Sequence, residues 1–169
     1  ITLKYIDDKP IGDFNHRRCE GHSYPGKYSE TFHAPNAHIL IIDDAPINLT
    51  VLKNLLKKTQ IHIDTALSGE DALSLSKKKK YDLIFVDYRM PNMNGVQIMQ
   101  HLKEDDKYKI NKDTPILILT ANDLDFAKNE FLRNGFDGYL SKPIDPKLLE
   151  ETTARLLPSD KVKRTSNHN

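Results

Sequence analysis

The chain has 169 residues, 38% of them hydrophobic and 29% charged, and its formal net charge is +1. This length and composition are typical of one soluble globular domain with some additional sequence. The near-neutral charge, the short apolar runs and the single cysteine give no argument for nucleic-acid binding, a membrane span or an internal disulfide framework.

Residues 1–36 differ in character from the rest of the chain. Ile1–Ile6 alternates like a half-buried strand, and the residues after it are polar and rich in Pro, Gly and His, without a helical period. We interpret residues 1–14 as the end of a preceding domain and residues 15–36 as a linker. Because the sequence opens with Ile1 rather than Met, we expect it to be part of a longer protein.

A group of metal-binding residue types lies in and beyond this linker. His16, Cys19 and His22 are spaced as ligands of a zinc site, and His33 and His38 follow them. One cysteine with loosely spaced histidines is a weak pattern for zinc, however, and a polar linker is the favoured interpretation.

Residues 37–157 alternate short apolar runs with helix-length amphipathic stretches, which indicates interleaved strands and helices. The apolar runs predict five strands, at residues 38–42, 61–65, 81–86, 115–119 and 138–141. Helical spacing and helix-end residues predict five helices, at residues 46–58, 69–79, 94–104 and 123–133 and after Asp145-Pro146. Residues 158–169 are polar, and we expect a disordered tail.

Five strands that alternate with five helices predict an α/β domain with a doubly wound parallel sheet. In such sheets the functional crevice lies at the carboxyl ends of the strands. Five polar residues come directly after four of the predicted strands, and they are Asp43, Asp44, Asp87, Thr120 and Lys142. We therefore expect these side chains to meet at one edge of the sheet.

The chemistry of these residue types indicates an aspartyl-phosphate site. Clustered carboxylates need a counter-charge, and Mg²⁺ prefers carboxylate oxygens and often bridges to a phosphoryl oxygen. Lys142 adds a fixed positive charge, and the Thr120 hydroxyl is a hydrogen-bond donor. In this interpretation Asp87 attacks phosphorus while the cations stabilise the transferring oxygens.

Residues 37–157 also resemble the receiver domain of two-component response regulators. The matching segments, in chain order, are Ile41–Asp44, Phe85–Asp87, Met90-Pro91, Gly95, Leu119–Ala121 and Ser141–Pro143. The resemblance implies a flavodoxin-like (βα)5 fold with strand order 2-1-3-4-5. It also implies that a phosphohistidine donates a phosphoryl group to the domain, which promotes its own phosphorylation and dephosphorylation.

The resemblance assigns a role to each residue of the acidic group. Asp87 is implied to be the phospho-acceptor. Asp43, Asp44 and Asp87 are implied to hold Mg²⁺, with Asp44 as the more direct ligand and the main-chain carbonyl of Arg89 as a further one.

The same resemblance implies a conformational switch. Lys142 is implied to pair with the phosphoryl group, with a cis bond to Pro143, and Thr120 to move toward a phosphoryl oxygen. Tyr139 is implied to turn inward behind Thr120. The surface that changes is then formed by the fourth helix, fifth strand and fifth helix (α4-β5-α5), over residues 122–157.

Two features favour the receiver of a hybrid sensor histidine kinase. Asp44–Leu49 resembles the start of the first helix in such receivers, and residues 1–14 more loosely resemble the end of a kinase ATP-binding domain. The expected partners are a histidine kinase dimerisation domain or a histidine phosphotransfer protein, with a weak homodimer as a further expectation. We expect a cytoplasmic domain without direct nucleic-acid or membrane contact, in a parent that can be membrane-anchored.

Two other functions stay open at this point. One is a hydrolase of the aspartyl-phosphate phosphatase type, although such enzymes carry two carboxylates two residues apart on the first strand, whereas Asp43 and Asp44 are adjacent. The other is a binding module that works without phosphorylation. Asn94, where many receivers carry Asp, and the side chain of Arg89 leave the dephosphorylation rate open.

Overall fold

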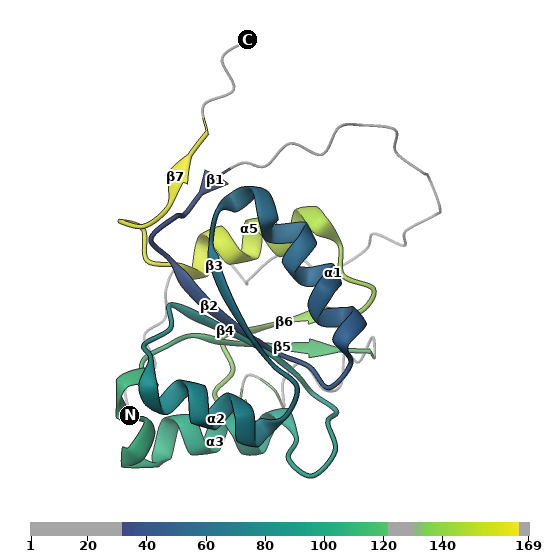
Figure 1. Ribbon diagram of the computed structural model, residues 1–169, viewed down its shortest axis with the longest axis vertical. Coiled ribbons are helices and arrows are strands. Elements are labelled where there is room, and N and C mark those ends of the chain that lie inside the picture. Colours follow the sequence, from purple (N-terminus) through teal and green to yellow (C-terminus); the bar gives the residue numbers. More distant parts are fainter. Residues whose placement is uncertain (1–31, 122–130, 132, 166–169) are drawn as a thin grey trace.

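A computed structural model describes residues 32–121, 131 and 133–165 of the chain (Figure 1). The segment 1–14, most of the predicted linker and three candidate zinc ligands (His16, Cys19 and His22) lie outside the described residues. The same holds for most of the predicted helix at residues 123–133, of which Phe131 and Arg133 are described as helical.

The centre of the domain is a parallel sheet of five strands. Along the sheet the order is β3-β2-β4-β5-β6, and every neighbouring pair is parallel. Counted along the chain, this is the predicted order 2-1-3-4-5, so the predicted doubly wound α/β fold is confirmed. The strands are β2 (His38–Ile42), β3 (His62–Ala66), β4 (Leu83–Asp87), β5 (Ile116–Thr120) and β6 (Gly138–Ser141).

Helices cover both faces of this sheet (Figure 1). One face carries α1 (Pro46–Leu56) and α5 (Pro146–Leu156), and the other carries α2 (Gly69–Lys78) and α3 (Gly95–Glu104). Two 3₁₀ helices, η1 (Lys57–Thr59) and η2 (Asp106–Asn111), follow α1 and α3. In the part of the chain that the structure describes, no helix combines the length and the apolar character of a membrane span.

Short polar side chains set where three of the helices begin. The side chains of Ser68, Asn94 and Asp145 accept backbone N–H groups in the first turns of α2, α3 and α5, respectively. At α3 the bond is reciprocated, because Gln97 accepts the N–H of Asn94 at 3.0 Å. These caps satisfy N–H groups that the helix itself leaves without a partner.

Alternate residues of the strands point into two apolar layers. The layer under α1 and α5 contains Ile39, Ile41, Leu83, Phe85, Leu117 and Leu119, and the layer under α2 and α3 contains Leu40, Ile42, Ile84, Val86, Ile116 and Ile118. All twelve side chains are fully buried. This burial on both faces explains why the strands appear in the sequence as continuous apolar runs.

The segments before and after the domain pair with each other, which the sequence does not predict. Strand β1 (Phe32–His33) lies antiparallel to β7 (Lys163–Arg164). Residues 158–165, which the sequence analysis assigns to a disordered tail, are described here and include β7, and Phe32, which it assigns to the linker, lies in β1. The physical reason is burial, because Phe32 is only 1% exposed and Val162 packs against the layer under α1 and α5.

A polar contact also holds this tail. The ammonium group of Lys161 donates to both carboxylate oxygens of Asp82 at 2.8 and 2.9 Å. Asp82 in turn accepts the backbone N–H of His38 at the start of β2. The tail is thus tied to the opposite end of the sheet from the predicted site.

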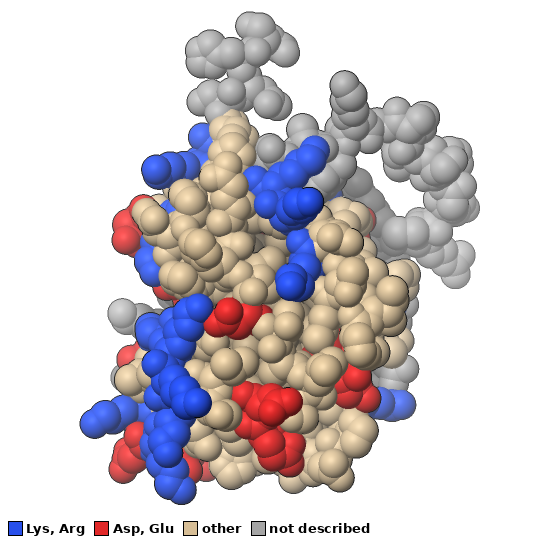
Figure 2. Space-filling model, in the orientation of Figure 1, with Lys and Arg blue, Asp and Glu red and all other residues tan. Residues whose placement is uncertain are grey.

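The charged side chains on the surface have no single dominant sign. On the face drawn in Figure 2, Lys and Arg side chains form a column along the lower left margin and a second group in the upper middle, and groups of Asp and Glu side chains lie among them. A mixed face of this kind agrees with the near-neutral net charge.

We expect Asn111→Ala to destabilise the domain strongly. The buried side chain of Asn111 accepts the N–H of Tyr81 and donates to the carbonyls of Ser76 and Lys79, so it joins η2 to the end of α2 and the start of β4. Its removal leaves these groups without their partner, at a cost of about 3 kcal/mol in the free energy of unfolding. Urea unfolding of both proteins measures the difference. A loss below about 1 kcal/mol, within the range of a single exposed hydrogen bond, would contradict this role.

Candidate functional site

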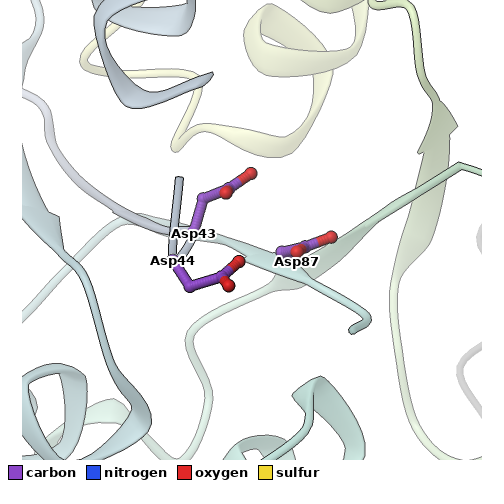
Figure 3. Close-up of side chains that lie close together, drawn as sticks. All are labelled: Asp43, Asp44 and Asp87. Atoms are coloured by element: carbon purple, nitrogen blue, oxygen red, sulfur yellow. The ribbon is translucent and has the colours of Figure 1, made fainter. Parts of the chain in front are cut away.

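The predicted polar residues do meet at the carboxyl edge of the sheet. Asp43 and Asp44 follow β2, and Lys142 follows β6. Asp87 and Thr120 are the last residues of β4 and β5, so each of these strands continues one residue beyond the predicted apolar run. Figure 3 shows the side chains of Asp43, Asp44 and Asp87 gathered at this edge, close to one another.

Asp43 is fully buried and holds several hydrogen bonds. Its Oδ1 accepts the backbone N–H of Ala45 at 2.9 Å, and its Oδ2 accepts Nζ of Lys142 at 2.8 Å. The side-chain amide of Asn48 donates to both oxygens, at 3.2 and 3.1 Å. A buried carboxylate without such donors would be costly, so these contacts satisfy the hydrogen-bonding capacity of Asp43 in its buried position.

Lys142 lies between two carboxylates. Its Nζ is 2.8 Å from Asp43 Oδ2 and 3.2 Å from Asp87 Oδ1, and its side chain is 22% exposed. Burial by itself would lower the pKa of Lys142, but the hydrogen bond to Asp43 and the charges of Asp87 and Asp43 outweigh it and raise the pKa. Lys142 is therefore a fixed positive charge at neutral pH.

The carboxylate of Asp87 has a longer contact to Lys142 than the carboxylate of Asp43 has. Burial raises its pKa, the charge of Lys142 and the hydrogen bond from it act in the opposite direction, and the charges of Asp43 and Asp44 raise the pKa further. The net shift is upward. Asp87 therefore belongs to a site with more negative charge than Lys142 neutralises.

The three carboxylates fit a divalent metal ion. One oxygen from each of Asp43, Asp44 and Asp87 lies within 4.8 Å of the others. Asp44 is exposed, whereas the other two are buried, so Asp44 is the side chain that solvent and an entering hydrated ion reach first. A hard cation that accepts one or two carboxylates and keeps several waters suits this donor set and its uncompensated charge.

The remaining predicted residues lie around this group. Thr120 is buried, and its carbonyl accepts the backbone N–H of Lys142 at 2.7 Å. Tyr139 is half-buried in β6 and packs against the layer under α2 and α3. Arg89 is exposed two residues beyond Asp87. The bond between Lys142 and Pro143 is cis, as predicted.

Asn48 is the site residue whose role the sequence analysis missed. In the sequence it served only as part of the segment that indicates a hybrid-kinase receiver. Its position in the first turn of α1, next to a loop that begins with Asp43, is the signal that could have identified it. An amide at that place can reach back to the carboxylate that precedes the helix.

Gly95 is required by a close approach of the chain to Asp87. A Cβ atom at this position would lie 2.9 Å from the carbonyl oxygen of Asp87 and 3.4 Å from Cα of Tyr88. We expect Gly95→Ala to destabilise the domain by about 1–3 kcal/mol, because backbone atoms have to shift to admit the methyl group. Thermal unfolding measures the effect. An unchanged melting temperature would show that the loop after β4 can shift to admit the methyl group without a loss of stability.

The sequence is similar to receiver domains. A family model described as the response regulator receiver domain matches residues 39–154. The aerobic respiration control sensor protein ArcB of Escherichia coli (strain K12) is 34% identical over 110 residues, which are 65% of this chain and 14% of ArcB. The sensor histidine kinase RcsC of Salmonella typhimurium is 33% identical over 127 residues, which are 75% of this chain and 13% of RcsC. The chain thus spans only a small part of these curated relatives.

Solved structures give the same result for the fold. The chemotaxis protein CheY4 of Vibrio cholerae has a TM-score of 0.64 and 31% identity, over 72% of this chain and 98% of CheY4. The receiver domain of the sensor histidine kinase PA1611 of Pseudomonas aeruginosa has a TM-score of 0.63 and 27% identity, over 71% of this chain and 96% of that one. That structure has a magnesium ion coordinated in its active site cleft.

Proposed function

The chain belongs to the response regulator receiver domain family, and from this membership we propose that its Asp87 accepts a phosphoryl group. Receiver domains of this kind act in two-component systems, and relatives of this chain include receivers of hybrid sensor kinases. The observation that carries the proposal is the position of Lys142, whose ammonium group lies between Asp43 and Asp87. A carboxylate beside a fixed cation and a metal-binding acidic group is suited to phosphoryl transfer.

The proposed step is a direct transfer from a phosphohistidine. A carboxylate oxygen of Asp87 attacks phosphorus, and a phosphorus–oxygen bond forms while the phosphorus–nitrogen bond breaks. The imidazole nitrogen leaves with the bonding electron pair and takes up a proton. Lys142 is already within 3.2 Å of Asp87 and balances negative charge that develops on the phosphoryl oxygens.

We assign the metal site to Asp43, Asp44 and Asp87, with the main-chain carbonyl of Arg89 as a further oxygen. Bound Mg²⁺ supplies positive charge next to the transferring oxygens. Asp44, being exposed, is the direct ligand that recruits the ion, whereas Asp43 is held by Ala45, Asn48 and Lys142.

The switch is proposed to run through Thr120 and Tyr139. Thr120 ends β5, the strand next to β4, and Tyr139 lies on β6, the strand next to β5. Asp87, Thr120 and Tyr139 thus lie on three successive strands of the sheet. Movement of Thr120 toward a phosphoryl group on Asp87 and of Tyr139 behind Thr120 would change the proposed switch surface, of which β6 and α5 lie within the described residues.

The phosphodonor is proposed to dock beside the first helix. Ile47 and Val51 are exposed on α1 at 68% and 45%, and Leu67 is exposed at 49% just beyond β3, at the same edge of the sheet as Asp43. Exposed apolar side chains that flank an acidic site fit a partner helix carrying a phosphohistidine, from a kinase dimerisation domain or a phosphotransfer protein.

Incubation with acetyl phosphate and Mg²⁺, followed by intact-mass and peptide mass spectrometry, tests the proposal. We expect one phosphoryl group per chain, on Asp87, released by hydroxylamine and not formed in excess EDTA. An adduct on another residue, or no adduct from acetyl phosphate or any histidine donor, would overturn it. Steady turnover of a simple phosphate ester that requires Asp87 would instead favour the hydrolase alternative.

A further inference from the structure

The buried Asp43 carboxylate depends on a cation that the proposed function needs elsewhere. Lys142 is nearer to Asp43, at 2.8 Å, than to Asp87, at 3.2 Å. When a phosphoryl group is attached to Asp87, its added negative charge draws Lys142 toward it. Asp43, which is 0% exposed, then loses part of its contact to Lys142 and depends more on its other hydrogen-bond donors.

Asn48 is placed to compensate for this loss. Its amide nitrogen is 3.2 Å from Oδ1 and 3.1 Å from Oδ2 of Asp43, so it faces both oxygens almost equally. The backbone of Asn48 is also held in place, because its N–H donates to the carbonyl of Ala45 at the start of α1. The contact between this amide and Asp43 does not involve Lys142.

We propose that Asn48 is a positioning residue that keeps Asp43 supplied with hydrogen bonds and so permits Lys142 to move to the phosphoryl group on Asp87. This inference rests on the proposed function. Without Asn48, the hydrogen-bond donors to Asp43 among the described residues would be the backbone N–H of Ala45 and Lys142. Lys142 would then be retained by Asp43, and an anion on Asp87 would lose part of its stabilisation.

The test uses beryllofluoride, a tetrahedral anion that binds a carboxylate as a phosphoryl group does. Its affinity is measured by fluorine NMR at saturating Mg²⁺ for the unsubstituted chain and for Asn48→Ala, and the Mg²⁺ affinity of each is measured separately. We expect Asn48→Ala to weaken beryllofluoride binding about tenfold, the scale of one hydrogen bond to a charged group. Mg²⁺ affinity should stay equal or become tighter, since only a neutral donor is removed.

Two further variants separate positioning from structural support. Asn48→Ser keeps a shorter donor and should fall between the two proteins, which also covers the case in which Asn48→Ala folds poorly. Asn54→Ala, an exposed asparagine on the same helix, is the matched control and should bind as the unsubstituted chain does. In a Lys142→Ala background, Asn48→Ala should lower the beryllofluoride affinity little further, because the two residues act through the same carboxylate.

Each outcome has a consequence. An equal fall in beryllofluoride affinity with and without Lys142, or a matching fall in Mg²⁺ affinity, would show that Asn48 only supports the structure and would overturn the inference. So would unchanged beryllofluoride binding in Asn48→Ala. Failure of the unsubstituted chain to bind beryllofluoride with Mg²⁺ would overturn the proposed function together with the inference.

Discussion

An Asp87→Asn chain should take up no phosphoryl group from acetyl phosphate, whereas the unsubstituted chain should take up one. The amide keeps the shape of the carboxylate but has no nucleophilic oxygen anion, so the phosphorus–oxygen bond does not form. Intact-mass spectrometry detects the difference directly. Asp71→Asn, which changes an exposed carboxylate in the first turn of α2, is the control and should be phosphorylated normally.

The same substitution should raise the melting temperature at neutral pH in EDTA. Because the pKa of Asp87 is raised in the folded chain, chiefly by burial, the ionised carboxylate opposes folding at neutral pH. The contribution of Asp87 to stability is full below its unfolded pKa and is lost as pH rises through its folded pKa. The gain of Asp87→Asn should therefore shrink as the pH is lowered through the raised folded pKa of Asp87, because the carboxyl group of Asp87 is then itself protonated. A gain in melting temperature that stays the same in acid would show that ionisation of Asp87 is not its cause.

The fold could be predicted because its strands are covered on both faces. Runs such as Leu83–Val86 and Ile116–Leu119 are continuous and apolar, and their short length and alternation with helical stretches favour strands buried on both faces. The strand ends were less predictable by one residue, because Asp87 and Thr120 continue the backbone pairing of a strand although their side chains are polar. Polarity shows where the core ends, not where the ladder ends.

The pairing of β1 with β7 could not be predicted. Both strands have two residues, and the stabilising contacts join positions more than a hundred residues apart in the sequence. Val162 stands between charged residues, so its burial depends on the surface it meets rather than on a local pattern. Local sequence patterns do not predict such long-range contacts.

Within the site, residue types could be predicted but pairings could not. The sequence indicates that Asp43, Asp44, Asp87 and Lys142 share an edge. It does not indicate that Lys142 is nearer Asp43 than Asp87, or that Asn48 contacts both oxygens of Asp43. Those facts depend on rotamers and distances within a packed loop, which strand order alone does not determine.

Lys142→Met should lower the stability of the domain by about 3 kcal/mol, the lower range for removing one partner of a buried ion pair. Methionine keeps the apolar stem but not the charge, so Asp43 and Asp87 lose their shared counter-ion. The loss stays at the lower end because Ala45 and Asn48 still donate to Asp43. Urea unfolding measures it. Lys147→Met is the control, since Lys147 is 78% exposed and pairs with Glu151 at 3.8 Å; this change should lower the stability by less than about 0.5 kcal/mol.

The stability difference between Lys142→Met and the unsubstituted chain should depend on pH and on Mg²⁺ in a defined direction. Its pKa is raised in the folded chain, so its stabilising contribution is full below the unfolded pKa of about 10.4 and is lost only as pH rises through the higher folded value. The difference between Lys142→Met and the unsubstituted chain should thus be constant through neutral pH. Mg²⁺ should stabilise the variant more than the unsubstituted chain, because it supplies charge that the carboxylates then lack.

Signalling should suffer more than phosphorylation in the same variant. Asp87 and the metal ligands remain, so acetyl phosphate should still transfer its phosphoryl group. Without the ammonium group, however, the attraction between residue 142 and the phosphoryl oxygens is lost. Movement of residue 142 is then not passed to Thr120 through the backbone hydrogen bond that joins them. Chemical shifts of Tyr139 and of α5 on phosphorylation measure the response. Shifts as large as those of the unsubstituted chain would show that Lys142 stabilises the resting site without transmitting its phosphorylation.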